Sequence, residues 1–167
     1  MLLIHLQVKR KTNSLLLIGR CFLLGACEYL LKKATGREID VSRLFIYYNA
    51  RMKVLDSDRQ LRDSGCSITK AIETLEETGN CLESIWPYDI KYVNHRPSDE
   101  AYDAANYSKI NDALQLRVDL EEMKSSLAQG FPFVFGLKLF TSFNQAARKG
   151  VVPMPKPGED ARGTHRQ

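Results

Sequence analysis

The segment Leu15 to Ala34, LLLIGRCFLLGACEYLLKKA, decides the fold because nearly every side chain in it is apolar. A helix that is apolar all round has to be buried on most of its faces, so we expect a central core helix here. Gly36 follows as a natural C-cap. Arg20 and Glu28 interrupt the run, and no uncharged stretch reaches the about 20 residues that a transmembrane helix needs. The segment therefore predicts a buried helix and no membrane span.

A basic cluster before this segment is similar to the start of a signal peptide. Lys9, Arg10 and Lys11 precede the apolar run, and Leu24 to Cys27 has the pattern of a lipoprotein cleavage site. Arg20 argues against export, because a charge at the centre of a membrane segment costs roughly 2.5–3.5 kcal/mol. We therefore favour a cytoplasmic location, and export stays open as the alternative.

Three amphipathic helices are predicted after the central segment, and each begins at a serine that can act as its N-cap. They are Ser42 to about Met52 with Leu44, Phe45 and Tyr48 on one face, Ser67 to Gly79 with Ile68, Ala71, Ile72 and Leu75, and a short helix after Ser98 that opens with Asp99 and Glu100. The stretch Trp86-Pro87-Tyr88 cannot continue a helix. We expect it to form an extended loop with Trp86 and Tyr88 as core anchors.

The pattern changes after about residue 106, and strand signals appear only there. Asp119 to Gln129 predicts an amphipathic helix that Gly130 closes. Phe131 to Phe140 predicts a buried strand of aromatic and aliphatic residues. The helix should turn inward the side chains of Leu120, Met123 and Leu127.

These elements predict an α+β fold with two lobes. Residues 1–105 are expected to form a helical lobe around the central helix, and residues 106–167 a lobe that contains strands.

Composition and charge exclude several classes of function. The net charge of +4 comes from 24 basic and 20 acidic residues spread along the chain, which argues against nucleic-acid binding. The cysteines form no C-x-x-C pair and the three histidines lie far apart, so neither a metal site nor a cofactor is expected. The sequence leaves open whether any thiols are joined as disulfides. The four cysteines are Cys21, Cys27, Cys66 and Cys81.

Several short segments are informative through their order and spacing, although none is specific alone. They are Ala26-Cys27-Glu28-Tyr29-Leu30, Ser42-Arg43-Leu44-Phe45-Ile46-Tyr47-Tyr48-Asn49, Asp63-Ser64-Gly65-Cys66 with Ala71-Ile72, Gly79 through Glu83 with Trp86-Pro87-Tyr88, Leu127-Ala128-Gln129-Gly130-Phe131-Pro132-Phe133-Val134, Gly150-Val151-Val152 and Gly163-Thr164-His165. In this order they resemble the papain-like (C1) cysteine peptidases, especially the short microbial members. The resemblance implies the papain-like fold, with a helical first lobe and a β-barrel second lobe that is incomplete here. It also implies peptide or protein substrates and peptide-bond hydrolysis.

The family's chemistry implies roles for particular positions. A cysteine thiolate at the start of the central helix attacks the peptide carbonyl, a histidine holds its proton, and an asparagine and a glutamine assist. His165 matches the histidine. The nucleophile position lies ten residues before the glutamate that Glu28 matches, and Ile18 occupies it. Cys21, three residues later, is the candidate nucleophile only if the helix begins later. Residues 8–19 contain no glutamine.

Other positions also depart from the family's pattern. Only two residues follow His165, so we expect a chain truncated at the catalytic histidine, without the strand and asparagine that follow in the family. In the family that later sequence covers much of the strand that residues 131–140 match, so the resemblance implies a partial second lobe and self-association through the apolar surface around these residues. Cys66 matches a cysteine that forms a disulfide in the family, but its partner position is Leu15. Ser67-Ile68-Thr69 replaces a Gly-Gly pair whose backbone pairs with substrate.

The leading interpretation is a papain-like cysteine peptidase homologue, truncated and inactive alone, and thus a pseudoenzyme. One alternative is an active thiol hydrolase that uses Cys21 and His165 and is completed by a separately encoded C-terminal part. Another is a helical protein-binding module that keeps the first lobe as an interaction surface.

Overall fold

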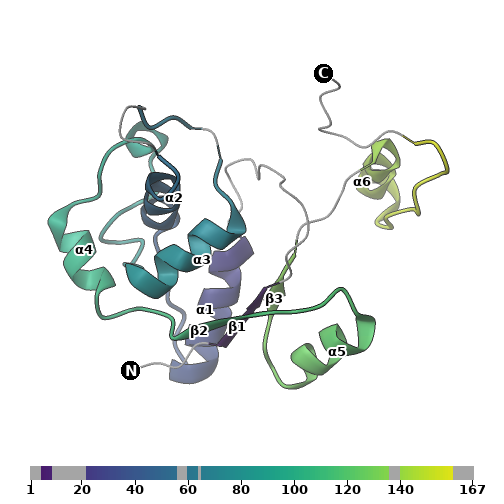
Figure 1. Ribbon diagram of the computed structural model, residues 1–167, viewed down its shortest axis with the longest axis horizontal. Coiled ribbons are helices and arrows are strands. Elements are labelled where there is room, and N and C mark those ends of the chain that lie inside the picture. The colour runs from purple at the N-terminus through teal and green to yellow at the C-terminus, as the bar shows by residue number, and fades with distance from the viewer. Residues whose placement is uncertain (1–4, 9–21, 56–59, 64, 136–139, 160–167) are drawn as a thin grey trace. The chain divides into compact units, whose positions relative to one another are not determined.

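The computed structural model describes residues 5–8, 22–55, 60–63, 65–135 and 140–159 (Figure 1). The chain divides into two compact units, Met1–Phe135 and Gly136–Gln167. The first unit contains β1 (His5–Val8), α1 (Phe22–Thr35), α2 (Arg43–Met52), α3 (Ile68–Glu77), the 3₁₀ helix η1 (Ile90–Tyr92), α4 (Asp99–Ala105), β2 (Asp112–Gln115), α5 (Leu120–Ala128) and β3 (Phe133–Val134). The second contains the 3₁₀ helix η2 (Thr141–Gln145) and α6 (Ala146–Lys149). The predicted lobes, 1–105 and 106–167, stay a prediction.

Helix α1 is a core helix, as its apolar sequence predicts. Its buried side chains form one cluster with Phe45 of α2 and Leu75 of α3. Gly36 ends the helix with a φ of 71°, and its N–H donates to the carbonyl of Lys32 at 2.8 Å. Residues 15–21 of the predicted helix lie outside the described residues. The buried side chains of α1 are Leu23, Leu24, Ala26, Cys27, Leu30 and Leu31.

All three predicted serine N-caps are confirmed. Each serine Oγ accepts a hydrogen bond from the backbone N–H three residues later, which satisfies one of the free donors at a helix start. The bonds are Phe45 N to Ser42 Oγ at 3.2 Å, Lys70 N to Ser67 Oγ at 3.2 Å, and Ala101 N to Ser98 Oγ at 3.3 Å. The serines therefore set where α2, α3 and α4 begin, and the buried residues of these helices belong to the same core cluster as those of α1.

A three-stranded sheet in the order β2-β1-β3 lies beside the helices (Figure 1). Both pairings are parallel, and His5 pairs with Asp112 while Val8 pairs with Val134. The prediction that strands appear only after residue 106 is wrong, because β1 is the central strand. Four residues carry too little periodicity to announce a strand, and β1 depends on partners about a hundred positions away.

The later segment also differs from its predicted packing. In α5, Leu120 is 64% exposed and Leu127 is 57% exposed, whereas Ser126 is buried. The helix is held by Ser126, whose Oγ donates to the carbonyl of Phe131 at 2.9 Å. An apolar stripe identifies a face of a helix, but it does not supply the element that would cover that face. The predicted inward positions Leu120 and Leu127 are therefore wrong.

In the described part of the strand predicted over Phe131 to Phe140, Phe133–Val134 forms β3. Val134 is buried, Phe135 is 45% exposed, and residues 136–139 lie outside the described residues. Short strands at a sheet edge need cover on both faces to be buried throughout. The expected self-association through this apolar surface stays a prediction.

The second unit is organised around Glu159. Its carboxylate accepts hydrogen bonds from the backbone N–H of Lys156 at 2.9 Å, from the backbone N–H of Ser142, and from Thr141 Oγ at 2.8 Å. These donors favour the charged carboxylate and hold the pKa of Glu159 at about 2. Across both units, none of the described helices combines the length and apolar character needed to cross a membrane.

Candidate active site

The two predicted catalytic residues, Cys21 and His165, lie outside the described residues, as does Ile18. Their catalytic roles therefore stay predictions. Within the described ranges, no three His, Cys, Asp or Glu side chains gather as they would around a metal ion. The structure does describe residues of the first unit that would surround a catalytic site.

The described thiols are poorly suited to nucleophilic attack. Cys66 and Cys81 carry free thiols, and burial raises the pKa of each to about 11. At neutral pH only about one in ten thousand such thiols is ionised. Arg51 lowers the pKa of Cys66, but less than burial raises it. Cys27 is fully buried in the core face of α1.

Arg51, near the end of α2, is a buried charge that joins two loops. It is 3% exposed, and its guanidinium lies over the ring of Tyr47 with 4.0 Å between Cζ and the ring centroid. Nη1 donates at 2.7 Å both to the carbonyl of Arg62 and to Oδ1 of Asn94. Nε donates to the carbonyl of Tyr47 at 3.3 Å, and Nη2 donates to the carbonyl of Val93. Arg51 thus ties the backbone of Arg62 and the loop after η1 to α2.

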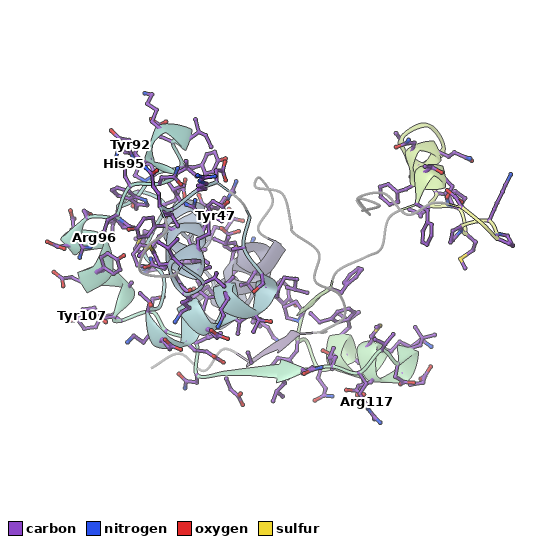
Figure 2. All side chains as sticks on the ribbon, turned by 45° about the horizontal axis from the view of Figure 1, so that its top comes forward. Tyr47, Tyr92, His95, Arg96, Tyr107 and Arg117 are labelled. Atoms are coloured by element: carbon purple, nitrogen blue, oxygen red, sulfur yellow. The ribbon has the colours of Figure 1, made fainter. Side chains whose placement is uncertain are left out.

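Tyr47, one helical turn before Arg51 and labelled in Figure 2, binds Asp63 and Gly65. Its hydroxyl donates to Oδ1 of Asp63 at 2.6 Å and accepts from the backbone N–H of Gly65 at 2.9 Å. Burial, reinforced by the hydrogen bond to Asp63, raises the pKa of the Tyr47 phenol. The phenol therefore stays protonated and keeps both bonds at neutral pH.

Sequence reasoning missed the roles of Tyr47 and Arg51. The sequence did contain a signal for these roles. Tyr47 and Arg51 are four residues apart and so lie on the same helix face, and an arginine on a buried face needs hydrogen-bond acceptors. The positions of those acceptors, on loops after residue 60 and after residue 92, could not be read from the chain.

Glu83 and Ser42 hold the passage that leads to Trp86 and Tyr88. Glu83 accepts from the backbone N–H of Tyr88 at 2.7 Å and from that of Arg43 at 3.3 Å. Ser42 Oγ donates to the carbonyl of Trp86 at 2.6 Å. Trp86 packs against the core as predicted, whereas Tyr88 is exposed, so its prediction as a core anchor is wrong. Glu83 fixes the backbone of Tyr88 and not its ring, which leaves the ring free to face solvent.

Trp86 begins a row of rings that runs to the surface. The Tyr92 ring lies 5.8 Å from that of Trp86 and 5.5 Å from that of His95, centroid to centroid, and Figure 2 shows Tyr92 and His95 next to each other. Such tilted and edge-on contacts are the geometries that aromatic pairs prefer. These ring contacts hold the loop after η1 against the core. Arg51 binds the same loop through Val93 and Asn94.

Replacing Ser42 by alanine is expected to cost roughly 2–4 kcal/mol of unfolding free energy, as the sum of a lost N-cap of about 1 and a buried carbonyl without a donor of about 1–3. Ser67→Ala removes an N-cap bond of the same 3.2 Å length but at an exposed serine, and should cost only about 1 kcal/mol. Urea unfolding followed by circular dichroism measures both. Equal losses would contradict the second role of Ser42.

Lys33 joins α1 to the turn between α5 and β3. Its Nζ donates to the carbonyl of Gly130 at 3.1 Å and lies 5.7 Å from the ring centroid of Phe131. Gly130 has a φ of 80°, and a Cβ there would lie 2.1 Å from Lys33 Nζ. The turn that sequence analysis predicted at Gly130 is thus also where the predicted second lobe meets the central helix.

Comparisons with known proteins agree with this architecture. No protein-family model matches the chain. An uncharacterized peptidase C1-like protein of Acanthamoeba polyphaga mimivirus is 38% identical over 134 residues, which cover 74% of this chain and 42% of that protein. The crystal structure of xylellain, a cysteine protease from Xylella fastidiosa, matches with a TM-score of 0.70 and 29% identity over 84% of this chain and 57% of that one.

The chain thus spans less than two thirds of either relative. The two matches nevertheless cover most of this chain, one through its sequence and the other through its fold. Both relatives have the peptidase type that the ordered segments from Ala26 onward resemble. The chain belongs to the papain-like, C1-type family of cysteine peptidases and has the α+β fold of that family.

Proposed function

We propose that this chain is a papain-like cysteine peptidase homologue that binds an extended peptide and does not hydrolyse it alone. The observation that carries the proposal is the place of Glu28 in α1, where its Oε1 accepts a hydrogen bond from the backbone N–H of Val41 at 3.3 Å. This bond anchors the register of α1 at the glutamate that matches the family's. Ten residues before Glu28 stands Ile18, whose side chain has no nucleophile.

Cys21 stands three residues after that position. In a helix, an offset of three residues moves a side chain by about 4.5 Å along the axis and rotates it by about 300°. A misplacement of about 1 Å in an active site can already cost a hundredfold in rate. The register at Glu28 therefore argues against Cys21 as the nucleophile.

The other cysteines do not replace it. Cys66 and Cys81 have pKa values of about 11, and Cys27 has no exposed surface. Thiolate catalysis needs a low pKa, a nearby histidine and donors for the oxyanion. A member of a peptidase family that lacks a competent thiolate can still bind peptides. Peptide binding is therefore the function that these residues support best.

The 167-residue chain is expected to release no fluorescent fragments from fluorescein-labelled casein at neutral pH, where papain does. Intact-mass spectrometry after incubation with a peptidyl vinyl sulfone should show no adduct on Cys21. The active-hydrolase reading predicts the opposite. An adduct that forms on the wild-type chain, persists in Cys66→Ala and disappears in both Cys21→Ala and His165→Ala would establish that reading and reject the inactive one.

Peptide binding is tested separately by fluorescence anisotropy of fluorescein-labelled oxidised insulin B chain, which is an extended peptide. Saturable binding that unlabelled B chain displaces is the expected result. Anisotropy that never saturates, or that unlabelled peptide leaves unchanged, would reject peptide binding for this chain.

A further inference from the structure

We propose that Asn106 carries an N-linked glycan and that the ring of Tyr107 covers its first sugar. The segment Asn106-Tyr107-Ser108 has the N-x-S/T pattern of a glycan acceptor, without proline in the middle position. None of the other six asparagines has a serine or threonine two positions later, so the pattern assigns one position. The proposal stands apart from the proposed peptide binding, because it uses none of the residues that carry that function.

The end of α4 presents Asn106 to solvent. Asn106 is the C-cap of this helix, and its backbone N–H donates to the carbonyl of Tyr102 at 3.2 Å. Its side chain is exposed, and its carboxamide forms no hydrogen bond to any residue that the structure describes. The fold therefore uses the backbone of Asn106 and leaves the side chain free for a bulky surface modification.

Ser108 supplies the hydroxyl of the pattern and also fixes the loop. In the folded chain Ser108 is half-buried, and its Oγ donates to Oδ1 of Asn80 at 3.2 Å. Its carbonyl accepts from the backbone N–H of Asn80 at 3.0 Å. Because the hydroxyl is engaged after folding, transfer of the glycan has to precede folding. The folded loop then holds Asn106 on the outside.

The reaction joins Nδ2 of Asn106 to C1 of the first N-acetylglucosamine. The donor is an oligosaccharide carried on a lipid diphosphate. The bond between C1 and the diphosphate oxygen breaks, the diphosphate leaves with the electron pair, and the amide nitrogen gives up one proton, so nothing is oxidised or reduced. Such donors serve the secretory pathway, so the proposal takes up the export alternative that the sequence leaves open.

Tyr107 is the observation that favours a sugar at this position. Its side chain is 93% exposed, more than any other large apolar side chain that the structure describes, and Figure 2 shows it at the edge of the first unit. An N-acetylglucosamine on the preceding residue has a face of C–H groups and an acetyl methyl group. Contact with these groups removes apolar ring surface from water.

The test is made on the full chain isolated from the cells that produce it. Peptide N-glycosidase F in H₂¹⁸O should remove the glycan mass and convert Asn106 into an ¹⁸O-labelled aspartate, which peptide mass spectrometry locates. In the same cells, Asn106→Gln and Ser108→Ala should lose the glycan. Two matched controls should keep it: Ser108→Thr retains the hydroxyl, and Asn111→Gln changes an exposed asparagine outside the pattern.

An unmodified Asn106 in the chain from its own cells, or a glycan that persists in Asn106→Gln, would overturn the proposal. The role of the ring is measured by iodination of Tyr107. Iodination should be about twofold slower in the glycosylated chain than after deglycosylation, because a sugar covers one face of the ring. Equal rates of iodination before and after deglycosylation would overturn the contact between Tyr107 and the sugar.

Discussion

Replacing Gly79 by alanine is expected to lower the free energy of unfolding by roughly 2–5 kcal/mol, of which about 1–2 arises from the left-handed backbone and about 1–3 from overpacking. Gly79 has a φ of 87° after the end of α3. A Cβ there would lie 2.1 Å from the carbonyl oxygen of Ala105 and 2.8 Å from that of Ser108. Both are backbone atoms, one in the last residue of α4 and the other three residues after it, so the clash can be relieved only by moving this backbone away from the end of α3.

Gly36 supplies the matched control for this prediction. It has a φ of 71°, and a Cβ there would meet nothing within 4 Å. Gly36→Ala therefore retains the backbone strain and lacks the clash, and should cost only about 1–2 kcal/mol. Urea unfolding of both variants gives the comparison. If Gly36→Ala proved as destabilising as Gly79→Ala, close packing of α3 against the end of α4 would be excluded as the cause.

Replacing Phe45 by alanine is expected to cost about 3–5 kcal/mol of unfolding free energy. Phe45 has no exposed surface, lies in the first turn of α2 and contacts the Tyr102 ring edge-on with 5.1 Å between centroids. Removing the ring leaves a cavity between α2 and α4 and also removes an aromatic pair worth about 0.5–1.5 kcal/mol. A loss of this size is a large share of the about 5–15 kcal/mol that holds a typical domain folded.

Phe45→Leu is a milder variant whose unfolding free energy can be measured if Phe45→Ala does not fold. It should give a smaller loss than the alanine variant, because most of the volume remains. Phe135→Ala removes the same ring from a position that is 45% exposed and should change stability by less than about 1.5 kcal/mol. Similar losses at Phe45 and Phe135 would show that burial in α2 is not what makes Phe45 important.

The sequence alone predicted only part of the candidate site. Glu28 and Cys66 could be matched by the order and spacing of the short segments that contain them. Tyr47 and Arg51 could not be assigned, since their partners Asp63, Gly65 and Asn94 are distant in sequence and reach them only after the loops close. A loop's backbone donors and acceptors carry no side-chain signature, so nothing in the chain announces which buried group they will meet.

Local chemistry in the sequence determined where the helices of the first unit begin and end. Serine oxygens can cap a helix from within its own chain, glycine can adopt a positive φ wherever it stands, and apolar spacing selects a face without reference to other elements. The predicted caps are therefore present in the structure. Ser42, Ser67 and Ser98 cap the starts of their helices, and Gly36 and Gly79 adopt a positive φ after the helices that they follow.

Only the tertiary structure decided which faces are covered and which segments pair. The central place of β1 in the sheet, the exposure of Leu120 and Leu127, and the acceptors around Arg51 all depend on elements far away in the chain. Strand pairing and burial are properties of two surfaces in contact, and one segment's pattern describes only one of the two. For that reason helix boundaries were predictable in this chain, whereas the sheet and the hydrogen bonds that hold Arg62, Asp63 and Gly65 were not.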